Sequence, residues 1–155
     1  MVEAEFPKLL HEFQKAAVDL NLKSNGINTT LFQCELALVN ANAGIEYWSR
    51  KELLSSEPET DEDGKHFREA DRLGFAKVDG EWHLAVQHVT KEWYTDDTGD
   101  QGWEIASTEM PVVLSQASRE LRIAALEELP DLIAKLTAKA LQAIKSIESA
   151  QKLLG

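Results

Sequence analysis

The stretch LGFAKVDGEWHLAV, residues 73–86, constrains the fold more than any other part of the chain. Asp79-Gly80 is a preferred two-residue turn between antiparallel strands, because glycine adopts positive φ without strain and aspartate tolerates it. Such a turn sets the register of the strands, and the expected opposite pairs are Val78–Glu81, Lys77–Trp82, Phe75–Leu84 and Leu73–Val86. We therefore predict a β-hairpin here, and with it an antiparallel sheet.

The two faces of this hairpin differ in the size of their side chains, because successive residues of a strand point to opposite faces. The larger side chains share one face: Trp82, Leu84, Val86 and His88. Small side chains thin the other face, which also carries Gln87: Gly74, Ala76 and Ala85. We expect the first face to pack on the core, and we expect the replacement of Gln87 by alanine to be nearly silent.

Helices are predicted at both ends of the chain. Over residues 3–21, apolar side chains recur at three- and four-residue intervals and so share one helical face: Phe6, Leu9, Leu10, Phe13, Ala17 and Leu20. A face this apolar is expected to pack on another surface. Asn25-Gly26 is expected to end this region in a left-handed turn. The segment 116–154 has a similar period and is expected to kink at Pro130, which lacks an N–H.

Residues 27–51 are predicted to form two strands. In the first, apolar and polar or small residues alternate with the period of a half-buried strand, the apolar set being Phe32, Cys34, Leu36 and Leu38. A helix through residues 31–39 is the competing interpretation and stays open. The second strand follows a loop-like stretch at residues 40–44, and residues 102–109 predict a further strand.

Together these elements predict a single α+β domain over residues 1–155. It has an N-terminal helix at residues 3–21 and an antiparallel sheet of four or five strands within residues 27–109. Long C-terminal helices over residues 116–154 are expected to pack on one face of this sheet.

The charge of the chain argues against nucleic-acid binding. The formal net charge is −11 at pH 7. Residues 1–129 hold 25 acidic and 12 basic residues, whereas residues 130–155 hold 2 and 4. A body this acidic repels phosphate backbones, so we predict no nucleic-acid partner.

Cysteine content and hydropathy suggest a compartment. Cys34 is the only cysteine, which excludes an internal disulfide and fits a reducing environment. The longest run without charged residues, 24–34, is too short and too polar to span a bilayer. The first residues are acidic and amphipathic, unlike a secretory signal. We predict a cytoplasmic protein with no membrane partner.

No catalytic, cofactor or metal motif is recognisable in the sequence. It contains no Gly-x-Ser-x-Gly elbow, phosphate-binding loop or dinucleotide fingerprint. His83 and His88 are five residues apart on a predicted strand, so they point to opposite faces and cannot share one metal ion. We therefore predict no cofactor, no metal and no catalytic residues.

These observations favour a non-catalytic, acidic interaction or accessory module, adaptor-like, whose partner is another protein or a second copy of itself in a homodimer. Self-association is expected through an alanine-rich stripe with three- and four-residue spacing on the C-terminal helix: Leu136, Ala140, Ala143, Ile147, Ala150 and Leu154. The alternative is a small apolar-ligand-binding protein or an enzyme, with a pocket between a curved sheet and the long helix. That pocket would be lined by Tyr47, Trp48, Phe75, Trp82 and His88.

Overall fold

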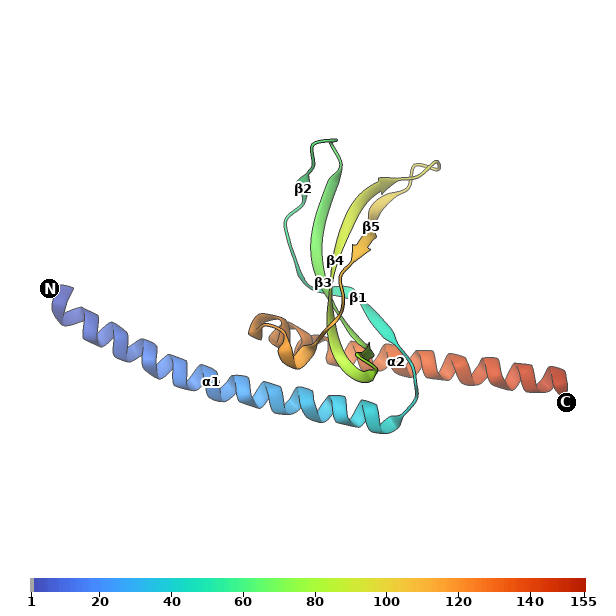
Figure 1. Ribbon diagram of the computed structural model, residues 1–155, viewed down its shortest axis with the longest axis horizontal. Helices are drawn as coiled ribbons and strands as arrows, with labels where there is room; N and C mark the ends of the chain where they lie inside the picture. Colours follow the sequence, from blue (N-terminus) through green and yellow to red (C-terminus); the bar gives the residue numbers. More distant parts are fainter. Residues whose placement is uncertain (1) are drawn as a thin grey trace.

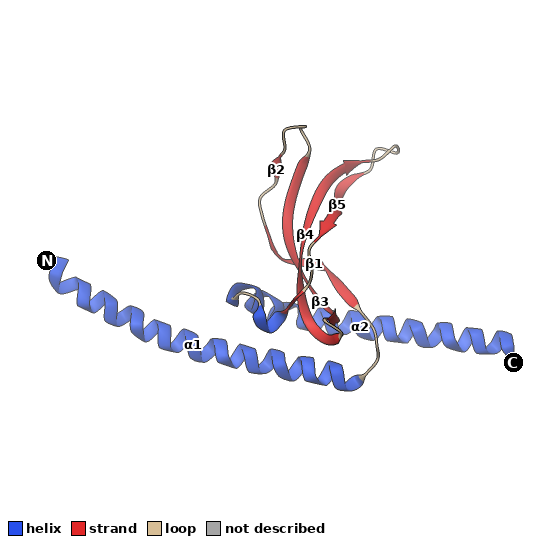
Figure 2. Cartoon of the chain, in the orientation of Figure 1, coloured by secondary structure: helices blue, strands red, loops and turns tan. Residues whose placement is uncertain are grey.

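The computed structural model describes the backbone of residues 2–155 and the side chains of residues 5–155. In chain order, its elements are α1 (Val2–Ala41), β1 (Tyr47–Ser55), β2 (Glu59–Thr60), β3 (His66–Val78), β4 (Glu81–Thr95), β5 (Gln101–Thr108), β6 (Val112–Val113), a 3-10 turn (Leu114–Gln116) and α2 (Arg119–Leu154). The predicted α+β class is confirmed. Two long helices lie at the base of the molecule, and the strands rise away from them (Figure 2).

The sheet is antiparallel throughout and has the strand order β1-β3-β4-β5. Two very short strands join it, β2 beside β3 and β6 beside β4, which brings the sheet to six strands. The longest strands, β3 and β4, run on beyond the level of the helices (Figure 1). Only the lower part of the sheet is therefore covered by a helix.

The predicted hairpin at Asp79-Gly80 is confirmed. Asp79 has a φ of 52° and Gly80 a φ of 85°, as a turn with two positive φ angles requires. All four predicted opposite pairs are present: Val78–Glu81, Lys77–Trp82, Phe75–Leu84 and Leu73–Val86. The turn chemistry alone was sufficient to define this register.

The predicted strand over residues 27–39 is wrong, and so is the predicted end of the first helix near residue 21. Helix α1 runs without a break to Ala41, and the expected turn at Asn25-Gly26 lies inside it. The hydroxyls of Thr29 and Thr30 donate to the carbonyl oxygens of Asn25 and Gly26 one turn earlier, as threonine side chains inside a helix can do. The side chains that face the core follow a helical period, not an alternation: Ile27, Leu31, Cys34 and Leu38.

Helix α2 is continuous from Arg119 to Leu154 and contains Pro130. The Ser118 side chain caps it by accepting a hydrogen bond from the Leu121 N–H. The ribbon changes direction after the first turns of the helix (Figure 1). None of the helices in the described residues is long and apolar enough to cross a membrane.

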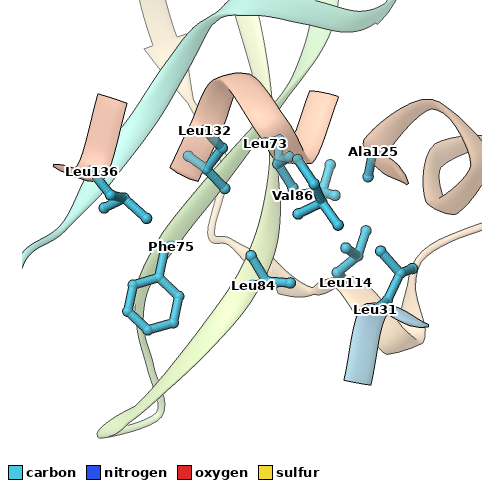
Figure 3. Close-up of a cluster of buried hydrophobic side chains, with 10 residues drawn as sticks. Leu31, Leu73, Phe75, Leu84, Val86, Leu114, Ala125, Leu132 and Leu136 are labelled. Atoms are coloured by element: carbon cyan, nitrogen blue, oxygen red, sulfur yellow. The ribbon is translucent and has the colours of Figure 1, made fainter. Parts of the chain in front are cut away.

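The hydrophobic core lies where the two helices meet the sheet (Figure 3). It joins one residue of α1, four of the β3–β4 hairpin, one of the 3-10 turn and four of α2: Leu31, Leu73, Phe75, Leu84, Val86, Leu114, Ala125, Leu129, Leu132 and Leu136. We call the sheet surface that carries Leu73, Phe75, Leu84 and Val86 the core face. The prediction that this face packs on the core is confirmed.

Candidate functional site

The five residues predicted to line a pocket do not converge on one cavity. Tyr47 lies opposite Phe75 in the sheet, and the Phe75 ring stacks on Trp82 with centroids 5.3 Å apart. These three rings pack against the core. Trp48 points to the opposite face of the sheet, where it lies over Gly74. His88 lies higher on the hairpin, opposite Asp71.

An apolar hollow of about 160 Å³ does lie between the sheet and the helices. Phe75 is the predicted pocket residue that lines it. The other lining residues come from the end of α1, the loop after it and the middle of α2: Leu38, Ala41, Ala43, Ile45, Ile133, Leu136, Thr137 and Ala140.

The two strand histidines have carboxylate neighbours. His88 Nδ1 lies 3.0 Å from Asp71 Oδ1 and Nε2 lies 3.4 Å from Glu69 Oε1. The hydrogen bond with Asp71 raises the pKa of His88 above its usual value. His83 Nδ1 lies 3.2 Å from Glu35 Oε1, which also accepts the Leu84 N–H at 2.7 Å and so ties α1 to the hairpin. Within residues 5–155, no cluster of three or more His, Cys, Asp or Glu side chains could hold a metal ion.

The predicted interface stripe on α2 is divided between the core and the solvent. Leu136 is buried and Ala140 is half-buried. The rest of the stripe is exposed, namely Ala143, Ile147, Ala150 and Leu154. We call the exposed segment 141–154 the α2 arm.

Helix α1 carries a longer stripe of the same kind. Its members are spaced alternately by four and three residues along the helix: Phe6, Leu10, Phe13, Ala17, Leu20, Ser24, Ile27, Leu31, Cys34 and Leu38. From Ser24 onward these side chains are buried or half-buried, whereas before Ser24 all but Ala17 are exposed. We call the exposed segment 5–23 the α1 arm. Its apolar face was recognised from the sequence, but the exposure of that face among the described residues was not.

The two helices lie side by side in the same direction but are offset along their length. Arg119 of α2 donates to the Asn21 side chain of α1 at 3.3 Å, and Arg122 donates to Asn28. Further along, Leu38 and Leu136 line the same hollow. The α1 arm therefore projects from one side of the molecule and the α2 arm from the other (Figure 1).

The face of the sheet opposite the core face is charged, and we call it the charged face: Trp48, Glu52, Arg68, Arg72, Gln87 and Lys91. The Glu52 carboxylate accepts two hydrogen bonds from Arg68, at 2.5 and 2.6 Å, and one from Lys91 at 2.6 Å. Burial alone would raise the pKa of Glu52, but the hydrogen bonds from Arg68 and Lys91 hold it below its usual value. One carboxylate thus neutralises only one of two adjacent cations.

Arg72 occupies the middle of the charged face. Its Nε and Nη2 atoms donate to Gln87 Oε1 at 3.0 and 2.5 Å, and Gln87 Nε2 donates to the Glu109 carbonyl oxygen. The guanidinium carbon lies 5.2 Å from the centre of the Trp48 ring. Trp48 can lie flat here because Gly74 has no Cβ, and a Cβ at that position would collide with the ring. Burial lowers the pKa of Arg72, although a guanidinium stays charged at neutral pH.

A hollow of about 270 Å³ opens beside Arg72. It is lined by residues of β1, β3, β4 and β5: Ser49, Arg50, Glu52, Arg72, Val89, Lys91, Trp103 and Ile105. Sequence reasoning missed it because its residues come from four strands whose order was unknown. The only available signal was the basic residues that alternate along the strands of a very acidic chain.

Comparison with known proteins gives no relative from which a function could be transferred. No family model, no curated protein and no solved structure matches the chain.

Proposed function

We propose that the protein is a non-catalytic assembly module whose copies associate through the α1 and α2 arms. One observation carries this proposal. In α1 a stripe with unbroken four- and three-residue spacing packs inside the chain from Ser24 onward and is exposed before it. In α2 the stripe begins at buried Leu136 and half-buried Ala140 and keeps its spacing into the exposed arm. A surface patterned like an interface on both sides of the packed centre is explained by a partner with the same pattern.

The exposed area supports a second copy as the partner. The chain has an accessible surface of 11173 Å², whereas a compact monomer of 17.3 kDa exposes about 7,800 Å². A standard interface buries about 800 Å² on each partner. The excess surface, about 3,400 Å², is large enough for each copy to take part in two such interfaces.

The offset between the helices favours head-to-tail pairing, in which the α2 arm of one copy lies along the α1 arm of the next. This continues the parallel α1–α2 packing that already exists inside each chain. The α1 arm presents the large side chains Phe6, Leu10 and Phe13. The α2 arm presents the small Ala143 and Ala150 between the larger Ile147 and Leu154, which leaves room for large side chains opposite the alanines. Such a heterologous contact builds a ring if it closes and a filament if it does not.

The basic test is the mass of the protein across a range of concentrations, measured by light scattering or sedimentation. We expect the mass to rise with concentration and to fall to that of a monomer for Phe13→Glu and for Ala143→Glu. The controls, Lys15→Gln and Lys145→Gln, change the charge by the same amount but lie off the stripes, and they should assemble normally. A strict monomer at high micromolar concentration contradicts the proposal, and so does normal assembly of both stripe variants.

Mixing the two stripe variants distinguishes head-to-tail pairing from symmetric pairing. Phe13→Glu keeps an intact α2 arm and Ala143→Glu keeps an intact α1 arm. In head-to-tail pairing the two together form a dimer of one copy each, although neither associates alone. If like arms paired with like, one of the variants would still dimerise by itself.

The apolar hollow between the sheet and the helices supports a second candidate function, the binding of a small apolar ligand. Its lining is nearly free of polar groups, as in many ligand cavities, although it is small. A thermal-shift screen with short fatty acids and aromatic compounds tests it. A ligand present at about 100 times its dissociation constant adds about 2.7 kcal/mol to the free energy of unfolding. The shift should disappear in Ala43→Trp, and no shift from any compound removes this candidate.

A further inference from the structure

Cations outnumber acids around the hollow on the charged face, although the whole chain carries a net charge of −11. Arg50, Arg72 and Lys91 line it, against one acid, Glu52, which is already engaged by Lys91 and by Arg68 behind it. We propose that this hollow is a binding site for a small ligand that carries a carboxylate or phosphate group on a flat apolar body.

Arg72 supplies the recognition of the anion. A guanidinium has five N–H donors, and the Gln87 side chain accepts from two of them, so that the other three have no acceptor among the described residues. No carboxylate within the described residues forms an ion pair with this guanidinium. A planar group with parallel free N–H donors binds the two oxygens of a carboxylate or phosphate together.

The guanidinium is held in place before any ligand arrives. Gln87 is 8% exposed, and its amide is fixed by the Glu109 carbonyl oxygen. The Trp48 ring lies against the guanidinium and adds a second contact that restrains it. A donor that is already oriented loses little conformational entropy on binding, which favours the affinity of even a small ligand.

The other walls select the body of the ligand. Val89, Trp103 and Ile105 give an apolar surface beside the cations. The Trp103 ring is itself held under the Arg68 guanidinium, 5.0 Å from its centre. A volume of about 270 Å³ suits one ring with its anionic group, and the acidic remainder of the chain repels a long polyanion.

The test titrates the whole protein with phenyl phosphate and with phenylacetate, followed by calorimetry and by tryptophan fluorescence. Inorganic phosphate and benzyl alcohol serve as the anionic and the apolar half of the ligand. We expect saturable binding of at least one aromatic anion, and binding of each half weaker by about tenfold or more. The tighter of the two aromatic anions tells whether phosphate or carboxylate is preferred. If neither saturates at millimolar concentration, or if benzyl alcohol binds as tightly, the proposal is overturned.

Two variants locate the site. Arg72→Gln should weaken binding about tenfold or more, while Lys77→Gln, which removes the same charge from the opposite face beside Trp82, should leave it unchanged. If Arg72→Gln does not fold, Arg50→Gln replaces it, because Arg50 is exposed and forms no ion pair among the described residues. Equal affinity of Arg50→Gln and the parent protein then contradicts the proposal.

Backbone amide shifts of the unaltered protein provide a readout that needs no variant. On addition of the tighter aromatic anion, we expect shifts to concentrate at Ser49, Arg72, Val89 and Ile105. Shifts confined to the helices would place the ligand in the apolar hollow instead and overturn this assignment. Phe13→Glu should bind as the parent does, so that failure of assembly and failure of ligand binding are separate results.

Discussion

The two halves of α1 carry one stripe, apolar at every position except Ser24, and yet have opposite surroundings. Leu31 and Leu10 occupy the same position of the repeat, three heptads apart. Leu31 is 6% exposed and belongs to the core, whereas Leu10 is 46% exposed and Phe13 is 69% exposed. The sequence pattern is the same in both halves, so the difference arises from what the rest of the chain places beside each.

The fold therefore depends on its centre, the region where the two helices pack on the sheet. The core is confined to the level where α1, α2 and the lower hairpin meet. The arms add length and surface without adding to that core, and the stripe of α2 repeats the arrangement, with Leu136 buried and Ile147 exposed. Amphipathic helices of this length are expected to gain most of their stability from packing, which the arms lack within one chain.

The largest effect is expected in the centre, from Leu31→Ala. Deleting a buried leucine side chain removes its transfer free energy and leaves a cavity between α1, α2 and the hairpin, which should cost about 2–5 kcal/mol of the free energy of unfolding. Urea melts at a concentration where the protein is monomeric measure it. A loss below about 1 kcal/mol would show that α1 is not part of the folded core and that its two halves do not differ in packing.

The second largest effect is expected from Gln87→Ala, which tests whether buried hydrogen bonds on the charged face also contribute to the free energy of unfolding. The substitution leaves two donors of Arg72 and the Glu109 carbonyl without their partner, so we expect a loss of about 1–3 kcal/mol. Gln142→Ala, the same change on the exposed α2 arm, should stay within about 0.5 kcal/mol. Denaturant melts of both variants measure the two losses, and equal losses would contradict the expected difference between Gln87 and Gln142.

The sequence alone gives the expectation that Gln87→Ala is silent, whereas the burial and hydrogen bonds of Gln87 in the structure give the opposite expectation. The hairpin was predictable because Asp79-Gly80 is a local signal. Gln87 instead accepts hydrogen bonds from Arg72 of the neighbouring strand, and Arg72 in turn lies over Trp48 of a third strand. Whether other side chains cover a face of small residues depends on the neighbouring strands, and the order of those strands was not known from the sequence.

The wrong prediction of a strand over residues 27–39 has a different cause. A short apolar run satisfies both the period of two and the period of 3.6, and Phe32 with Leu36 suggested the first. Leu31 and Leu38 decide between them, because they reach the core only from a helix. The hollow on the charged face could not be predicted either, because its lining residues come from four strands whose order must be known first.

A smaller effect on the free energy of unfolding is expected from pH. It should change the stability of the folded chain but not the association of the α1 and α2 arms. The hydrogen bond with Asp71 raises the folded-state pKa of His88 above its unfolded value of about 6.5. The resulting stabilisation is fully present below pH of about 6.5 and is lost as pH rises through the folded-state pKa. The difference in free energy of unfolding between the parent and His88→Gln should therefore be largest in mild acid and should shrink with rising pH. Association through the apolar arms should change little over the same range, and a parallel loss of association would contradict the separation of body and arms.

The smallest effect on stability is expected from Leu10→Ala, which matches Leu31→Ala in chemistry and in position within the repeat. Leu10 lies on the α1 arm, is 46% exposed and does not belong to the hydrophobic core, so its truncation leaves that core intact and should change the free energy of unfolding by less than about 0.5 kcal/mol. The same variant should weaken self-association, because Leu10 lies on the stripe that the arm offers to the next copy. Melts at low concentration and sedimentation at high concentration separate the two quantities. If Leu10→Ala changes neither quantity, the stripe on the α1 arm has no role as an interface. If it destabilises the monomer as much as Leu31→Ala, the arm is packed within the chain and the two halves of α1 do not differ.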